Sequence, residues 1–132
     1  MIQYIVLLCL AYINGKIAWK AARREHLRQF EDNLKFRMTA AQNSFEQRVE
    51  LIAEAHHRFV WIHPFVNGNG RTTRLVTDLI ALKCGEAPFT LYVREVGELR
   101  SKYIQAIRQA DRGDFTELRT LVRGGLLRSR GT

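Results

Sequence analysis

A histidine, a glycine-rich turn and two arginines follow one another in the segment HPFVNGNGRTTR at 63–74. The neutral imidazole of His63 can accept a proton near pH 7. Backbone N–H groups of the turn at 68–70 can converge on an anion. The guanidinium groups of Arg71 and Arg74 can bind phosphate oxygens in pairs. These residue types at this spacing predict an active site that handles phosphate groups.

The turn consists of Gly68, Asn69 and Gly70, and we expect it to form the anion site. Glycines are needed there because side chains would block the approach of a phosphate and strain the turn. A helix that begins after the turn points its first N–H groups and its positive dipole end at the anion. Arg71 and Arg74 are three residues apart, so both project from one face of that helix.

Two helices are expected to hold this segment between them. Ser44 can cap the first of them, with Gln47 at the capping-box position, and its apolar stripe continues to Trp61. Pro64 then ends that helix. The second helix is expected to begin near residue 71 or 72 and to end before Gly85 and Pro88. We expect its buried face to comprise Leu75, Val76, Leu79, Ile80 and Leu82.

Helical spacing of apolar residues continues through almost the whole chain. We therefore predict an all-α protein with one domain over residues 1–132, in which the active-site loop joins two central helices. Further helices are expected at 2–13, 18–37, 96–110 and 115–122, followed by a basic, glycine-containing tail at 123–132.

The net charge of +8 favours anionic partners, such as nucleotides, nucleic acids or acidic proteins. The basic runs lack interleaved aromatic residues, so we interpret them as solvated faces and do not expect a nucleic acid partner. Nucleic acid binding remains an alternative, which predicts an affinity that falls steeply with salt. Cys9 and Cys84 have no partner at metal-ligand spacing, which favours a reduced, cytoplasmic protein. The apolar run at 4–13 is shorter than the ~20 residues that a membrane span needs.

The segment 63–74 resembles the signature HPFx(D/E)GNGRxxR of the Fic (Fic/Doc) domain family at every fixed position except Asn67. The similarity extends over about residues 44–122, whereas residues 1–43 match weakly. It implies a Fic-type helical bundle, with a short β-hairpin flap whose one candidate is the stretch Asn14–Trp19. The further residues that resemble the family pattern are His56, Phe59, Ile62, Arg100, Tyr103, Ala106, Ala110, Gly113 and Asp114.

The resemblance implies a protein adenylyltransferase, which transfers AMP from ATP to a Ser, Thr or Tyr hydroxyl of a target protein. If the matching residues have the roles that they have in the family, His63 is the base, and Gly68, Asn69 and Gly70 form the anion hole. Arg71 would contact the distal phosphates and Arg74 the γ-phosphate. Phe65 would point into the core and anchor the loop.

Asn67 stands where the family usually carries an acid that holds Mg²⁺ on the α- and β-phosphates. A neutral amide offers a metal one weaker oxygen and no charge. We therefore expect Mg²⁺ or Mn²⁺ to be held mostly by the phosphates of the nucleotide. The alternatives are slower catalysis, transfer of a different phosphate-containing group, or a Fic-like module that binds a nucleotide or peptide without turnover.

Each site residue also has a structural alternative. His63 could be a capping or packing residue, and Arg74 could pair with Asp78 one turn later. His56 and His57 lack acid or cysteine ligands at zinc-site spacing, so we expect His56 to be a core or loop-bracing residue. A Walker A loop would need Lys in place of Arg71, and a dinucleotide fingerprint would need Gly in place of Thr73.

Many Fic proteins carry an inhibitory helix with the pattern (S/T)xxxE(G/N), and its glutamate blocks the γ-phosphate site. No Ser or Thr of this sequence has a Glu four residues later. We therefore expect any inhibition to come from a separate antitoxin partner or from a region missing from this chain, which would fit a toxin role in bacteria.

Overall fold

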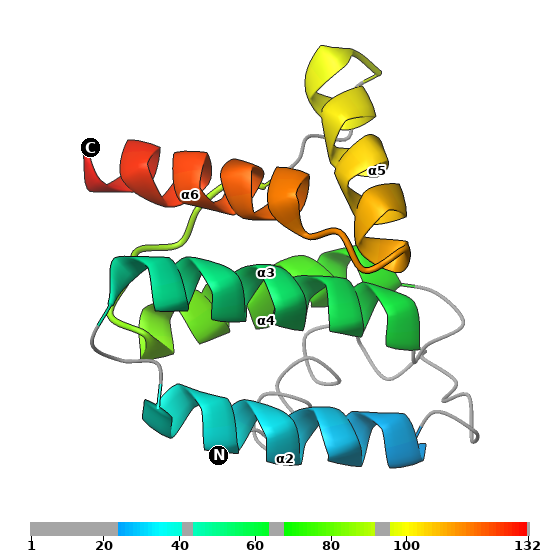
Figure 1. Cartoon of the computed structure of the whole chain (residues 1–132), viewed down its shortest axis with the longest axis vertical. Coiled ribbons are helices and arrows are strands. Elements are labelled where there is room, and N and C mark those ends of the chain that lie inside the picture. The colour runs from blue at the N-terminus through cyan, green and yellow to red at the C-terminus, as the bar shows by residue number, and fades with distance from the viewer. Residues whose placement is uncertain (1–23, 41–43, 64–67, 92–95, 132) are drawn as a thin grey trace.

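The computed structural model describes residues 24–40, 44–63, 68–91 and 96–131, and within these ranges it contains five helices and no strand. The all-α prediction is therefore confirmed for the described part of the chain. The predicted helix at 2–13 and the candidate flap Asn14–Trp19 lie outside the described residues. The helices are α2 (Arg24–Ala40), α3 (Phe45–Ile62), α4 (Asn69–Lys83), α5 (Glu98–Asp111) and α6 (Thr116–Arg130) (Figure 1).

Helix α3 is the centre of the bundle, and α2, α4 and α6 all pack against it (Figure 1). Helix α5 packs on α6 and stands across one end of the bundle. Within the described residues, no helix is long and apolar enough to cross a membrane. The two helices next to the predicted site, α3 and α4, are therefore also neighbours in the middle layer.

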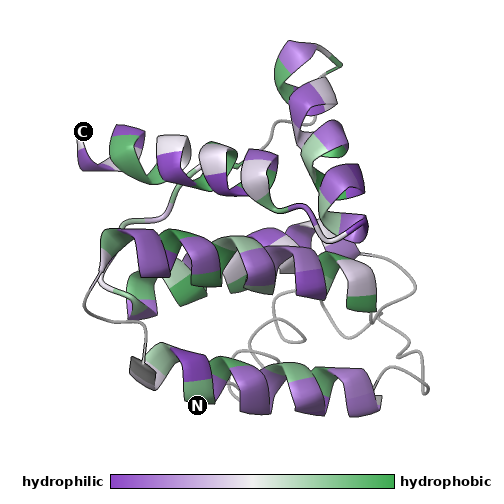
Figure 2. Cartoon of the chain, in the orientation of Figure 1, coloured by the Kyte–Doolittle hydropathy of each residue, from purple (hydrophilic) through white to green (hydrophobic). Residues whose placement is uncertain are grey.

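Local sequence explains why α3 forms where it does. Ser44 has an extended backbone, and its hydroxyl accepts a hydrogen bond from the N–H of Gln47 at 3.4 Å, as the cap prediction required. The buried stripe includes Val49, Ile52 and Phe59, at the spacing of one helical face. Figure 2 shows that hydrophobic and hydrophilic residues alternate along each helix, which is the pattern of helices with one buried side.

Two predictions for α4 need correction. The helix begins at Asn69 rather than at residue 71 or 72, because Gly68 takes a left-handed conformation and its carbonyl accepts from the N–H of Thr72 at 3.0 Å. Leu82 was expected in the core but is 52% exposed. It lies on the opposite side of the helix from Ile80, which is buried.

The predicted basic tail at 123–132 is wrong, because α6 continues to Arg130. Burial extends this helix, since Gly125 and Leu126 pack into the core. A Cβ added to Gly125 would lie 2.5 Å from the ring of Phe89, so a glycine at this helical position allows close packing. Arg123 pairs with Glu46 of α3 at 2.7 Å, and this contact fixes part of the segment predicted to be a tail.

Candidate active site

His63 follows directly after the last residue of α3 and has a φ of 46°, in the left-handed region. Its N–H donates to the carbonyl of Phe59 at 3.2 Å, which closes the helix. Residues other than glycine rarely adopt this conformation, and such strained positions cluster at functional sites. Among the described residues, His63 is the one non-glycine with a positive φ. Its side chain is exposed, so the imidazole is accessible to a substrate.

Gly68 lies at the other end of the loop and is the N-cap of α4, with a φ of 83°. N–H groups in the first turn of a helix have no acceptor within that helix, and glycine has no side chain that could cap them. The first turn of α4 also contains no acidic residue. The positive end of the helix dipole is therefore directed at the segment that the sequence predicted to bind an anion.

His63, Asn69, Gly70 and Arg74 border one cavity of about 270 Å³ between α3, α4 and α5. The structure thus brings together four of the residues predicted for the site. The cavity is also lined by residues that were not predicted for it: His56, Val60, Thr73, Arg100, Tyr103 and Ile104. The described residues that line the cavity include two arginines, Arg74 and Arg100, and no carboxylate. The cavity therefore favours an anionic ligand.

Arg71 borders a neighbouring hollow of about 440 Å³, and Arg74 borders both this hollow and the cavity. Asp78 also lines the hollow. Burial raises the pKa of Asp78, while the N–H of Phe89 and the charge of Arg74 lower it to a lesser extent. The two arginines are therefore neighbours at the start of α4, and Asp78 is close enough to Arg74 to act on it electrostatically.

Phe65 and Asn67 lie outside the described residues, so their predicted roles as loop anchor and metal ligand stay predictions. Among the described residues, no cluster of three His, Cys, Asp or Glu side chains could hold a metal ion. The donors around the cavity are imidazole, hydroxyl and amide groups, which do not match the carboxylate-rich ligand sets of Mg²⁺. The described residues therefore provide no magnesium site of their own.

His56 is buried at the back of the cavity and bonded through both ring nitrogens. Its Nδ1 lies 2.8 Å from Oγ1 of Thr77, and its Nε2 lies 2.8 Å from the hydroxyl of Tyr103. Burial, with a smaller contribution from the charge of His57, lowers the pKa of His56 from 6.5 to about 3. His56 is thus a neutral core residue, as the sequence predicted.

Sequence reasoning missed the contribution of α5 to the cavity. Arg100 and Tyr103 attracted notice only as part of a family-like closing helix. Their spacing of three residues puts them on one face of α5 and was the available signal. What could not be read from the sequence is that α5 stands across the end of α3 and α4 and so faces His63.

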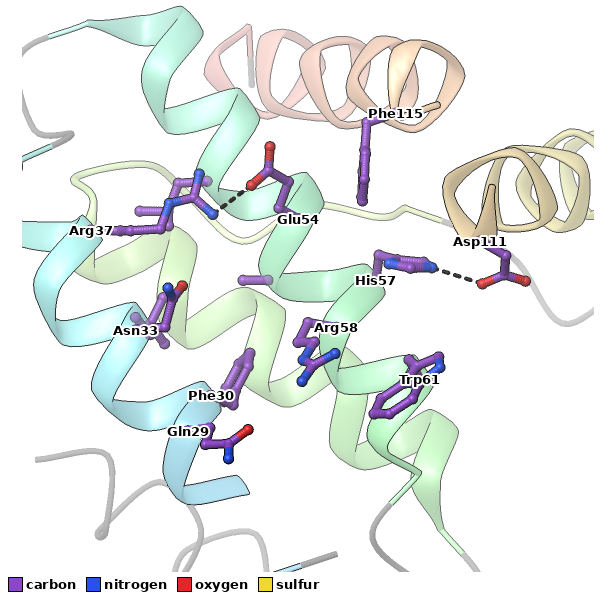
Figure 3. Close-up of a pocket in the computed structure, with 13 residues that line it drawn as sticks. Gln29, Phe30, Asn33, Arg37, Glu54, His57, Arg58, Trp61, Asp111 and Phe115 are labelled. Atoms are coloured by element: carbon purple, nitrogen blue, oxygen red, sulfur yellow. Dashed lines mark hydrogen bonds and ion pairs between the residues drawn. The ribbon is translucent and has the colours of Figure 1, made fainter. Parts of the chain in front are cut away.

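A second and larger hollow, of about 770 Å³, lies on the other side of α3, against α2 (Figure 3). Four of its ionisable side chains form two pairs. His57 contacts Asp111 at 2.8 Å, and Arg37 contacts Glu54 at 2.6 Å. None of the residues predicted for the site lines this hollow.

A comparison with known protein sequences finds relatives that are named protein adenylyltransferases. The sequence is 41% identical over 75 residues to protein adenylyltransferase fic-1 of Caenorhabditis elegans, and 36% identical over 67 residues to protein adenylyltransferase Fic of Nematostella vectensis. These matches cover 57% and 51% of this chain. The chain spans only 13% and 15% of the length of the two relatives.

Solved structures show the same fold. Fic-1 from C. elegans superposes with a TM-score of 0.63 at 24% identity, over 89% of this chain and 37% of that one. The BepC protein from Bartonella tribocorum, solved with bound AMPPNP, gives 0.62 at 20% identity, over 78% and 47%. The model of the Fic/DOC family matches residues 12–81, which is more than half of the sequence. This protein therefore belongs to the Fic/DOC family.

Proposed function

We propose that this protein transfers AMP from ATP to a Ser, Thr or Tyr hydroxyl of a target protein. The observation that carries the proposal is the cavity of about 270 Å³ where the strained, exposed His63 meets the N-terminus of α4 and Arg74. The similarity to proteins named protein adenylyltransferase supports the same reaction. Both the residue types and their arrangement suit a nucleotide as the donor.

In the proposed reaction the hydroxyl oxygen of the target attacks the α-phosphorus of ATP. A new P–O bond forms, the bond between the α-phosphorus and its bridging oxygen to the β-phosphate breaks, and pyrophosphate leaves. The imidazole of His63 accepts the proton of the hydroxyl. The target is left with AMP in a phosphodiester bond.

The charge that develops on the phosphate oxygens needs fixed donors. The N–H groups at 68–70 supply such donors at the positive end of α4. Arg71 and Arg74 would bind the distal phosphates, with Arg74 on the γ-phosphate. Arg100, which faces the same cavity from α5, adds a cationic group that the sequence did not assign to the site.

The metal requirement follows from the ligands that the chain offers. When bound, Mg²⁺ would neutralise phosphate charge and help pyrophosphate to leave. Because Asn67 replaces the usual acid and the described part of the cavity wall contains no carboxylate, we propose that the nucleotide phosphates supply most of the metal ligands. Asn67→Asp would then strengthen metal binding.

A nucleotide-binding module without turnover is the second candidate, and Asn67 is the observation that favours it. Such a module would keep the cavity and the anion site and lose only the transfer step. Transfer of a different phosphate-containing group is a third candidate, which Asn67 also favours.

The test is incubation of the purified chain, alone and with cell lysate, with α-³²P-labelled ATP, GTP, UTP or CTP and either Mg²⁺ or Mn²⁺. We expect label from ATP to appear on protein, to be lost in His63→Ala and to increase in Asn67→Asp. His57→Gln is the matched control, because His57 lies in the other hollow. Absence of label with every donor, together with retained nucleotide binding, would instead establish the binding module.

We further propose that inhibition of the enzyme comes from a separate antitoxin protein in the cytoplasm or from a region missing from this chain, since the residues of this sequence lack the (S/T)xxxE pattern. Expression of the chain in a host cell should then arrest growth, and His63→Ala should relieve the arrest. Growth that is unaffected by a protein with demonstrated transferase activity would contradict the toxin role.

A further inference from the structure

A chain of hydrogen bonds connects α5 to the anion-binding turn through the interior of the protein. It begins at the hydroxyl of Tyr103, which lies 2.8 Å from Nε2 of His56, and continues from Nδ1 of His56 to Oγ1 of Thr77 at 2.8 Å. The hydroxyl of Thr77 donates to the carbonyl of Thr73 at 2.7 Å. The hydroxyl of Thr73 donates to the carbonyl of Asn69 at 2.7 Å. Three helices are thus joined by one polar path.

The direction of each bond follows from the available hydrogens. The hydroxyl of Thr77 has a single hydrogen, which it gives to a backbone carbonyl, so it accepts from Nδ1–H of His56. A neutral imidazole with a protonated Nδ1 has a lone pair on Nε2, so Tyr103 is the donor there. This series of hydrogen bonds therefore selects the tautomer of His56 that carries its hydrogen on Nδ1.

Burial makes this arrangement hard to replace. His56 is only 2% exposed and Thr77 only 4%, so water is not available to either as a substitute partner. A buried polar atom that loses its partner costs more free energy than the hydrogen bond itself contributes. Burial also keeps His56 neutral, with a pKa of about 3, so the tautomer persists across the physiological range.

The same residues form much of the cavity wall. Asn69, Thr73, His56 and Tyr103 all line the cavity that His63 borders. Helix α5 packs mainly on α6, through its buried residues Ala106 and Ala110. The bond from Tyr103 to His56 thus ties the cavity side of α5 to the centre of the bundle.

We propose that Tyr103 and His56 are positioning residues, which hold α5 and the anion-binding turn at the separation that a bound nucleotide requires. Neither residue transfers a proton in this proposal, because the series of hydrogen bonds ends at the backbone carbonyl of Asn69, which cannot take up a proton. The inference rests on the proposed function for its effect on nucleotide binding, while the coupling between the two elements can be measured without turnover.

The variants are Tyr103→Phe, which removes one hydroxyl, and Thr77→Val, which breaks the chain in its middle. Thr120→Val is the matched control, because Thr120 makes the same kind of bond to the carbonyl of Thr116, at 3.0 Å, on the exposed side of α6. Urea unfolding of each purified chain first establishes that the variant is folded. The kcat and KM of AMP transfer and the Kd for ATP are then compared.

We expect Tyr103→Phe and Thr77→Val to lower kcat/KM by up to about 100-fold, as misplacement of a bound substrate by a fraction of an ångström to one ångström does. The Kd for ATP should rise with KM, and Thr120→Val should leave all three quantities unchanged. Unchanged kinetics and unchanged Kd in a folded Tyr103→Phe would overturn the inference.

Side-chain and backbone ¹⁵N NMR supplies the readout that does not depend on the reaction. In the wild type, His56 should show a protonated Nδ1 and an unprotonated Nε2. The amides of Asn69 and Gly70 should shift in Tyr103→Phe and Thr77→Val, and not in Thr120→Val. The opposite tautomer, or shifts confined to α5, would overturn the inference.

The two proposals fail in distinguishable ways. If the wild type neither binds nor transfers nucleotide, the proposed function falls and the amide shifts alone decide the coupling. If the wild type transfers AMP and Tyr103→Phe does so equally well, with unmoved amides, the function stands and the positioning role is wrong.

Discussion

The two hollows on either side of α3 differ in a way that size does not predict. The larger, of about 770 Å³ against α2, contains the carboxylates of Glu54 and Asp111 (Figure 3). The smaller, of about 270 Å³, has Arg74 and no carboxylate among the described residues of its wall. Of two hollows, the larger is the usual first candidate for an active site. Here the chemistry of the walls points to the smaller one.

The difference lies in how each region uses its cations. In the larger hollow Arg37 is bound to Glu54, and Arg58 lies 4.6 Å from the centre of the ring of Trp61. The ion pair joins α2 to α3 and compensates both charges, and the guanidinium of Arg58 packs on a ring of its own helix. In the cavity, Arg74 and Arg100 lie near the positive N-terminal end of α4, and the described lining residues include no carboxylate. A wall whose described residues include arginines and no carboxylate therefore distinguishes the candidate site from the larger hollow.

The largest expected difference between the regions is the effect of removing one arginine from each. Arg74→Ala should lower kcat/KM for AMP transfer by about 100-fold, which is typical of the loss of one group that stabilises charge in the transition state. Arg58→Ala removes a guanidinium from the other hollow and should change kcat/KM little. The measurement is labelled AMP transfer at several ATP concentrations. Equal losses in the two variants would remove the distinction between the hollows.

The next prediction concerns pH and the two adjacent histidines, since His56 faces the cavity and His57 the larger hollow. Below about pH 6.5 the unfolded chain takes up a proton at His56, whereas the folded chain does not until about pH 3. The free energy of unfolding should therefore fall as pH drops through this window, by about 1.4 kcal/mol per pH unit from this residue. Above pH 7 this contribution is fully present.

Urea unfolding at pH 7.5, 6.0 and 5.0 measures this dependence. His56→Gln should be less stable at pH 7.5 and should lose this part of the slope, while His57→Gln should retain it. A wild-type stability that stays constant between pH 6.5 and 5.0 would show that His56 is not held neutral.

The sequence predicted the reactive residues of the site better than it predicted which residues line the cavity. His63, the turn at 68–70 and the first residues of α4 are contiguous, and local signals such as the Ser44 cap and the glycines place them. Arg100 and Tyr103 reach the cavity only because α5 crosses the end of the bundle, and that crossing depends on packing against α6. Such distant packing leaves no local signal in the sequence.

The error at the C-terminus has the same cause. Charged residues and glycines at 123–130 predicted a tail, yet Gly125 allows close contact with Phe89, and Arg130 binds the buried carboxylate of Glu86 at 3.0 Å. Arg48 of α3 binds the same carboxylate at 2.9 Å. These two bonds lower the pKa of Glu86. Contacts with Glu86 and Phe89 stabilise the basic run as a helix. Because these partners are distant in sequence, the run itself gives no sign of them.

The smallest expected effects come from the ion pairs of the larger hollow. Glu54 binds Arg37 at 2.6 Å and Arg119 at 3.0 Å, so it bridges α2 and α6 across α3. Each pair is partly exposed, and such pairs contribute about 0–1 kcal/mol. Glu54→Gln should cost more stability than Arg37→Ala, because it removes two ion pairs and leaves Arg119 with Glu50 alone, whereas the loss of Arg37 removes one pair.

Urea unfolding at 0.1 M and 1 M NaCl measures both losses, and each should shrink at high salt because salt screens partly exposed charges. Neither variant should change AMP transfer, since neither residue lines the cavity. A marked loss of transfer in a stable Arg37→Ala would mean that the larger hollow contributes to function, and that paired charges alone do not mark a region as structural.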